Sequence, residues 1–156
     1  MNPCPCGYLG DPSGRCRCSA EQIQRYRSKL SGPLLDRIDL HLHVAREATA
    51  LHANPDSASS SAQAAATVAA ARQRQEQRQG GANAFLDLQQ LRQHCGLSDD
   101  DQHWLESACE RLGLSLRAAH RLLKVARTLA DLDAVDAIQR SHLAEALQYR
   151  PSSPTA

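Results

Sequence analysis

Residues 114–132, with the sequence LSLRAAHRLLKVARTLADL, decide the fold. Ser115 can accept a hydrogen bond from the first backbone N–H groups of a helix, and no glycine or proline follows it in this stretch. Apolar residues recur every three or four positions, as on one face of an amphipathic helix: Leu116, Ala119, Leu123, Ala126 and Leu129 or Ala130. The stretch therefore predicts a long helix at the centre of a helical domain.

The same helix carries basic residues at steps of four, three and three, namely Arg117, Arg121, Lys124 and Arg127. This spacing predicts a basic stripe, which is either an anion-binding surface or ordinary surface charge. Arg117 falls near the helix amino end, where a cation is unfavourable beside the positive end of the helix dipole. Its position indicates a role in holding an anionic ligand.

Further helices are predicted on both sides of this one. They cover residues 61–79, from Phe85 to near Gly96, 98–112 and 141–149. The first contains Arg72, Arg74 and Arg78, which predict a solvated helix face or, as the alternative, a surface that faces nucleic acid. Three consecutive aspartates follow Ser98, and they suit the cap and dipole of a helix better than a metal site. Together these patterns predict a mainly α protein.

Four cysteines lie close together near the amino terminus. Two C-x-C pairs, Cys4 with Cys6 and Cys16 with Cys18, are separated by a loop rich in glycine that can fold back on itself. Four thiolates on one hairpin can bind Zn²⁺ tetrahedrally, although the commonest spacing is C-x-x-C. Reduced free thiols or a redox pair are the alternatives. Cys95 and Cys109 fall in helical sequence, where they are expected as small buried side chains.

A second informative stretch is residues 31–40, SGPLLDRIDL. Gly32 and Pro33 start a turn, and the residues after Arg37 alternate between apolar and polar through Val44, which predicts a strand. An arginine at the mouth of a strand is well placed to offer its planar donors to a phosphate. The alternative is a solvated arginine at a strand end.

Composition excludes several classes of protein. The chain has 156 residues, a formal net charge of +1 and only 3% aromatic residues, so it is not a globally basic nucleic-acid binder. No apolar run is as long as a membrane span, and the amino terminus does not resemble a signal peptide. We therefore expect a cytoplasmic protein with no membrane partner.

Four blocks, in this order, closely resemble the carboxy-terminal part of the magnesium-chelatase-like AAA+ ATPases of the YifB/ComM type. They are residues 2–7 (NPCPCG), 16–18 (CRC), 31–40 and 114–132. The resemblance implies a helical lid domain at 61–150, preceded by a remnant of an α/β core at 1–44, with one strand and a Cys-rich loop. It also implies a linker at 45–60 and a disordered tail at 151–156. The remnant is expected to be poorly ordered without the rest of its sheet.

The resemblance also implies roles for individual residues. Asn2 matches sensor 1, which orients the attacking water or senses the γ-phosphate. Arg37 matches the arginine finger that reaches the ATP of a neighbouring subunit in a ring. Arg117 matches the sensor-2 arginine that contacts the ATP phosphate. ATP and Mg²⁺ would be used only in the full-length protein, because this sequence contains no G-x-x-x-x-G-K-[ST]. Alone, the chain is not expected to hydrolyse ATP, and we expect it to be a carboxy-terminal portion.

Two other functions remain open at the level of sequence. One is a stand-alone zinc-containing module that binds nucleic acid through Arg25, Arg72, Arg121 and Lys124, with DNA as partner. The other is a pure interaction module, which would not need Arg37 or Arg117.

Overall fold

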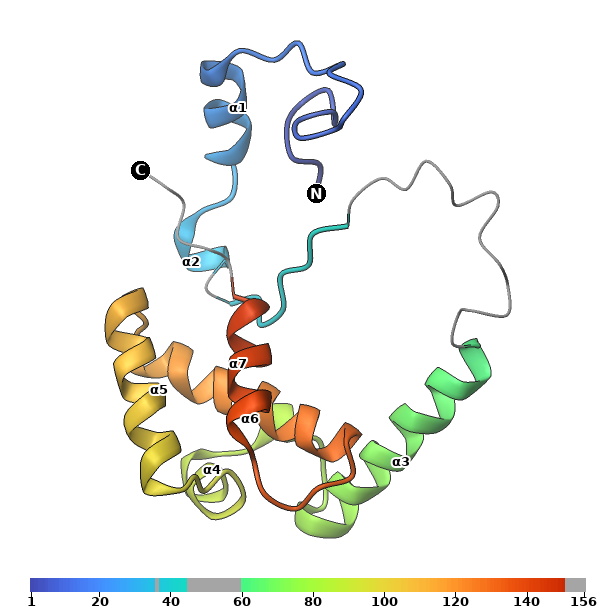
Figure 1. Ribbon diagram of the computed structural model, residues 1–156, viewed down its shortest axis with the longest axis vertical. Coiled ribbons are helices and arrows are strands. Elements are labelled where there is room, and N and C mark those ends of the chain that lie inside the picture. Colours follow the sequence, from blue (N-terminus) through green and yellow to red (C-terminus); the bar gives the residue numbers. More distant parts are fainter. Residues whose placement is uncertain (36, 45–59, 151–156) are drawn as a thin grey trace. The chain divides into compact units, whose positions relative to one another are not determined.

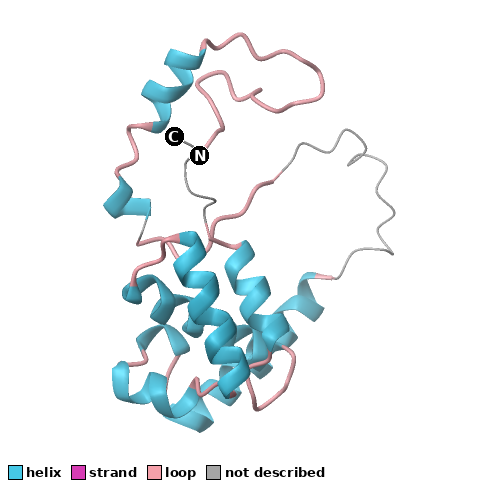
Figure 2. Ribbon diagram, turned by 60° about the vertical axis from the view of Figure 1, so that its left-hand side comes forward, coloured by secondary structure: helices cyan, strands magenta, loops and turns pink. Residues whose placement is uncertain are grey.

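The computed structural model describes residues 1–35, 37–44 and 60–150. They form two compact units. The cysteine unit comprises described residues of 1–38 and 42–44, and the helical unit comprises 39–41 and 60–150. The predicted linker, apart from Ser60, and the predicted tail lie outside the described residues. Figure 2 shows helices and loops but no strand in the described ranges, which confirms the mainly α fold class.

The cysteine unit contains a helix directly after the second C-x-C pair. Helix α1 (Ala20–Arg27) begins at Ser19, whose hydroxyl accepts from Gln22 N–H at 3.2 Å while the Gln22 side chain accepts from Ser19 N–H at 3.0 Å. This reciprocal capping satisfies two backbone donors that have no partner within the helix. Arg27 Nε lies 3.4 Å from the Pro3 carbonyl oxygen and so joins α1 to the cysteine loop. The short helix α2 (Gly32–Leu35) follows.

The predicted strand after Arg37 is wrong for this chain. Residues 38–44 form no strand, and Leu42 and Val44 are 72% and 87% exposed. In the described part of the chain no second strand lies beside this segment. A strand needs a neighbour to pair its backbone N–H and C=O groups, so the alternating pattern alone does not produce one.

The helical unit consists of five α-helices and a short 3₁₀ helix among the described residues. Their bounds are α3 (Ser61–Gln79), η3 (Asn83–Phe85), α4 (Leu88–His94), α5 (Asp99–Leu112), α6 (Leu116–Leu132) and α7 (Arg140–Gln148). The expected caps are present, since Ser98 and Ser115 accept from Asp101 and Ala118 N–H groups. Gly80 and Gly113 end α3 and α5 with positive φ angles of 74° and 61°, a conformation that favours glycine.

Helix α6 is the central helix, as predicted. It packs against α7, α3, η3 and α4 (Figure 1). Its buried face agrees only in part with the predicted one: Ala126 and Ala130 are buried as predicted, but Leu116 is 73% exposed, and Ala118 and Leu122 are buried as well. Both sets have helical spacing, so periodicity alone did not distinguish them. Among the apolar residues of the predicted helix that starts at Phe85, Leu86 and Leu91 are buried, but Phe85 itself is 82% exposed.

A buried polar network joins α3, η3 and α6. The Asp131 carboxylate, 1% exposed, accepts from Arg78 Nη1 at 2.5 Å and from Asn83 Nδ2 at 2.8 Å. Arg127 Nη2 lies 3.2 Å from the same carboxylate, and Arg74 Nη1 donates to the Asp131 backbone oxygen at 3.1 Å. Arg78 is partly buried in this network and so does not belong to the solvated face, or the nucleic-acid surface, that the sequence predicts, whereas Arg72 and Arg74 are exposed.

The predicted basic stripe on α6 is also wrong in part. Arg127 is 2% exposed, and it donates to the Asp136 and Val135 carbonyl oxygens at 2.5 and 2.7 Å. Lys124 donates to the Ala84 carbonyl oxygen at 3.0 Å. The helix packs closely enough on its neighbours to turn these cations toward carbonyl groups, which a linear pattern of charges does not reveal. Among the described helices, none is long and apolar enough to cross a membrane.

Candidate functional site

The cysteine loop brings the two C-x-C pairs together. Gly7 and Gly10 have φ angles of 82° and 83°, and these left-handed positions let the chain reverse direction after the first pair. The Cys4 sulfur lies 3.4 Å from the Cys6 sulfur and 3.8 Å from the Cys16 sulfur, and the Cys6 and Cys16 sulfurs are 3.7 Å apart. With Cys18 included, all four sulfurs lie within 4.8 Å of one another.

The sulfur–sulfur distances in the cluster fit a metal site and exclude a disulfide. A disulfide requires sulfurs about 2.05 Å apart, so none of these pairs is bonded, and all four cysteines are free. A tetrahedral site with Zn–S bonds of about 2.3 Å places its sulfurs about 3.8 Å apart. The cluster therefore has the ligand type, number and spacing of a Zn(Cys)₄ centre. Within the described residues, no other group of three or more potential metal ligands is this close.

Backbone amides prepare the cluster for negative charge. The Tyr8 N–H donates to the Cys6 sulfur and, with hydrogen bonds from Cys18 and Cys4, lowers the pKa of Cys6 to about 6. The Cys6 N–H acts in the same way on Cys18, but the sulfurs of Cys6 and Cys4 and burial outweigh it and raise the pKa of Cys18 to about 12. For Cys16, burial and the neighbouring sulfurs outweigh the Cys18 N–H, so its pKa is also raised. Burial and the Cys6 sulfur raise the pKa of Cys4, but hydrogen bonds from the Leu9 backbone, Cys16 and Cys18 outweigh them and lower it. Cys4 and Cys6 therefore favour the thiolate, whereas Cys16 and Cys18 need a cation to lose their protons.

The residues matched to ATP contacts are divided between the two units. Asn2 is exposed beside Gly7 in the cysteine loop, and Arg37 is exposed in the turn after α2, with its N–H bonded to the Leu34 carbonyl oxygen at 3.1 Å. Both belong to the cysteine unit. Arg117 lies in the helical unit, exposed in the first turn of α6. Within the cysteine unit, the structure brings the four cysteines together.

One contact near these residues was not expected from the sequence. Arg121 Nε donates to the Asp39 carboxylate, and His41 N–H donates to the Tyr149 carbonyl oxygen at 2.7 Å. Asp39 and His41 thus belong to the helical unit although they follow Arg37 closely in sequence. Asp39 and Arg121 are 82 positions apart, so no local pattern could have paired them.

Comparison with protein families shows which family the chain belongs to. The profile of the family described as magnesium chelatase, subunit ChlI C-terminal, matches residues 58–150, which is more than half of the chain. The chain belongs to this family. The profile of magnesium chelatase, subunit ChlI, matches residues 1–52 as well. The helical unit of the present structure is consistent with the helical lid domain of the ChlI C-terminal family.

Several curated members of the family are similar along nearly all of this chain. YifB of Escherichia coli is 48% identical over 154 residues, and the competence protein ComM of Haemophilus influenzae is 45% identical over 152 residues. Rv2897c of Mycobacterium tuberculosis is 37% identical over 152 residues. Each alignment covers 96% of this chain but only 29–30% of the relative, so the chain spans less than a third of the length of these proteins.

Proposed function

We propose that this chain provides the lid and the arginine-finger segment of a ring-forming AAA+ ATPase that uses ATP and Mg²⁺. In this proposal Arg117 contacts the ATP phosphates, Arg37 reaches the ATP of a neighbouring subunit, and Asn2 orients the attacking water. Residues 61–150 form the lid, and 1–44 belong with the ATPase core. Family membership supports the general class of protein, and the roles of the three residues are our assignment.

The position of Arg117 is the observation that carries this proposal. It is exposed in the first turn of α6, where the backbone N–H groups already create positive potential. The first turn contains no acidic residue, and within the described residues Arg117 forms no ion pair. Arg121, Lys124 and Arg127 on the same helix are each bound to protein oxygens. Arg117 is therefore the cation on α6 that is available for an external anion such as a phosphate.

The segment after Arg37 supports a shared function of the two arginines. Asp39 is held by Arg121, which lies one helical turn after Arg117 on α6. The backbone bond from His41 to Tyr149 adds a second attachment. Because Arg37 is only two residues from Asp39, the chain can span at most about 7 Å between their Cα atoms. In this proposal, a movement of α6 caused by nucleotide binding at Arg117 would move Asp39, which follows Arg37 closely in sequence.

The Arg117 assignment predicts weaker ATP binding when this side chain is removed. In a full-length relative, the substitution equivalent to Arg117→Ala is expected to lower ATP affinity roughly 10- to 150-fold, because a hydrogen bond to a charged group contributes about 1.5–3 kcal/mol. Fluorescent-nucleotide titration would measure this change. Arg111→Ala, an exposed arginine near the end of α5, is the matched control and should leave affinity unchanged. Equal affinity of both variants would refute the assignment.

We also propose that Cys4, Cys6, Cys16 and Cys18 bind one Zn²⁺. The sulfur distances and the backbone N–H groups that point at the sulfurs support this, because such donors stabilise thiolates. A divalent cation would remove the repulsion that keeps Cys16 and Cys18 protonated. The ion would hold the loop closed and so fix the position of Asn2.

Zinc binding should release protons. At neutral pH Cys16 and Cys18 retain theirs, because their pKa values lie above the ordinary value of a thiol. Each zinc should therefore displace at least two protons, and affinity should rise about 100-fold per pH unit over this range. Calorimetry in buffers of different ionisation enthalpy measures the protons, and mass spectrometry the stoichiometry. Cys18→Ser should abolish tight binding while Cys109→Ser, in the helical unit, should not. Buffer-independent heats would contradict the proposal.

The stand-alone nucleic-acid module is not favoured in the form predicted from the sequence. Three of its four cations are engaged within the helical unit: Arg72 pairs with Glu76 at 3.3 Å, Arg121 with Asp39, and Lys124 with a carbonyl oxygen. They do not form one available basic surface. Arg25 differs from them, because it lines a groove in the cysteine unit.

A further inference from the structure

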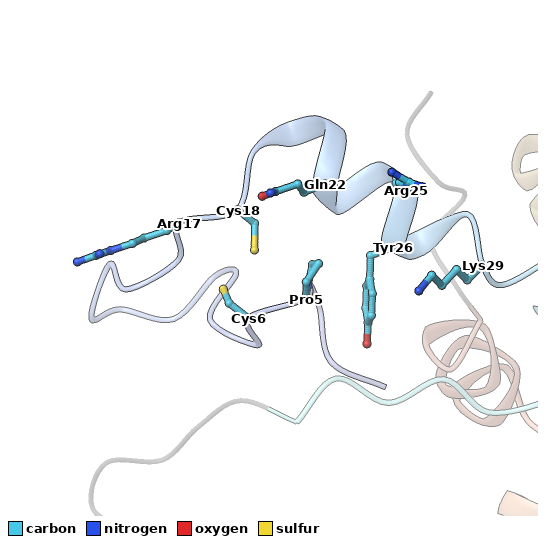
Figure 3. Close-up of a pocket in the computed structure, with 8 residues that line it drawn as sticks. All are labelled: Pro5, Cys6, Arg17, Cys18, Gln22, Arg25, Tyr26 and Lys29. Atoms are coloured by element: carbon cyan, nitrogen blue, oxygen red, sulfur yellow. The ribbon is translucent and has the colours of Figure 1, made fainter.

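A groove of about 810 Å³ lies between the cysteine loop and helix α1 (Figure 3). The loop contributes Pro5, Cys6, Arg17 and Cys18. Helix α1 contributes Gln22, Arg25 and Tyr26, and Lys29 follows the end of the helix. Tyr26 projects from α1 toward Pro5, and Lys29 lies beside it (Figure 3). All of these residues belong to the cysteine unit, so the groove is formed within one compact body.

The groove is positively charged and has no acidic residue in its lining. Its three cations are Arg17, Arg25 and Lys29, and all three are exposed. Within the part of the chain that the structure describes, none of their side chains forms an ion pair. Residues 1–35 contain five basic and two acidic side chains, which outweigh the charge of −2 that a Zn(Cys)₄ centre would carry. The surface therefore attracts an anion.

The shape and the aromatic residue narrow the class of anion. Arg25 and Lys29 are four positions apart, so they lie on the same side of α1 and its continuation and can contact consecutive phosphates. Tyr26, between them in sequence, is half-buried and offers part of its ring to the groove. A cationic track with an aromatic ring is the arrangement by which proteins hold single-stranded nucleic acid, where phosphates bind the cations and a base stacks on the ring. An acidic peptide would use the cations but gain nothing from the ring.

We propose that this groove binds single-stranded nucleic acid, with Arg17, Arg25 and Lys29 on phosphates and Tyr26 stacked on a base. The binding is sequence-tolerant, because every base has a face that can stack. The proposal rests on the metal centre proposed above only for the shape of the loop. It does not depend on ATP, Arg37 or Arg117.

The test is fluorescence anisotropy of a labelled oligo-dT strand with the zinc-loaded chain. With three phosphates neutralised, affinity should fall roughly 20-fold between 50 and 200 mM salt. The double variant Arg25→Ser/Lys29→Ser should bind at least about tenfold more weakly and show a shallower salt dependence. Tyr26→Ala should lower affinity roughly 5- to 150-fold, while Tyr26→Phe should keep it, because stacking needs the ring and not the hydroxyl.

The matched control removes the same charge elsewhere. Arg92→Ser/Arg111→Ser replaces two exposed arginines of the helical unit and should leave oligonucleotide affinity unchanged. Zinc content and far-UV circular dichroism show whether each variant is folded. If Tyr26→Ala is not folded, the Arg25→Ser/Lys29→Ser variant still tests whether the groove binds the oligonucleotide. Equal loss in both double variants, or equal competition by a poly-glutamate peptide, would overturn the proposal. The equivalents of Arg37→Ala and Arg117→Ala should retain binding, which separates this result from failure of the ATPase assignment.

Discussion

Replacing Arg37 with alanine is expected to lower the turnover number for ATP by about three orders of magnitude in a full-length relative. An arginine finger stabilises the charge that develops on the transferred phosphoryl group, and its loss typically costs about 10³-fold or more. ATP affinity should change much less, because the finger acts on the transition state in the neighbouring site. Steady-state hydrolysis and nucleotide titration together separate the two effects. A turnover number within a few-fold of the wild type would show that Arg37 is not the finger.

Mixed rings would test whether the finger acts between subunits. Subunits with Arg37→Ala should regain activity when combined with subunits whose own phosphate-binding lysine has been removed. In such a ring, an intact nucleotide site can face an intact Arg37 from its neighbour. Absence of any recovery, with ring assembly verified by light scattering, would indicate that Arg37 acts within its own subunit. Arg92→Ala, on α4, is the control for loss of an exposed arginine.

The substitution with the largest expected effect on stability is Asp131→Ala. Its carboxylate is the common acceptor for Arg78, Asn83 and the buried Arg127, so its removal leaves buried positive charge without a partner. Breaking a buried ion pair on one side costs about 3–5 kcal/mol. Urea unfolding followed by circular dichroism should show this as a lower midpoint. Asp133→Asn, which alters an exposed carboxylate bound to His142, should cost less than about 1 kcal/mol.

The Asp131 carboxylate also makes the stability of the fold depend on pH, and the direction of this dependence follows from its pKa. Burial raises the pKa of Asp131, but hydrogen bonds from Arg78 and Asn83 and the charge of Arg127 outweigh burial and lower it. A lowered pKa in the folded state means that the contribution to stability is fully present above the unfolded value of about 3.9. This contribution to stability is lost as the pH falls through the lowered pKa of Asp131 in the folded state. The Asp131→Asn variant should lack this component, and an unchanged acid profile would contradict the assignment.

The sequence alone predicted the helices and their ends well, because these depend on neighbouring residues. Ser98 and Ser115 cap the helices that they were expected to cap, and Gly80 and Gly113 end α3 and α5. A cap is a bond between residues two or three positions apart, so the sequence contains all of its information. The proximity of the two C-x-C pairs was predicted for the same reason, since only a short loop of turn-forming residues separates them.

Other features depended on contacts between distant residues. Whether Ile38 and its neighbours form a strand depends on a partner strand, and the choice of buried face on α6 depended on how α7 and α3 pack. The fate of each arginine was likewise decided by its surroundings. Arg127 and Arg78 are bound to Asp131, Arg121 to Asp39, and Arg117 remains available at the start of its helix. The sequence determined which segments are helical and which residues could carry charge, because these are local properties. Only the tertiary structure decided which charges are neutralised, because their partners come from segments far apart in the chain.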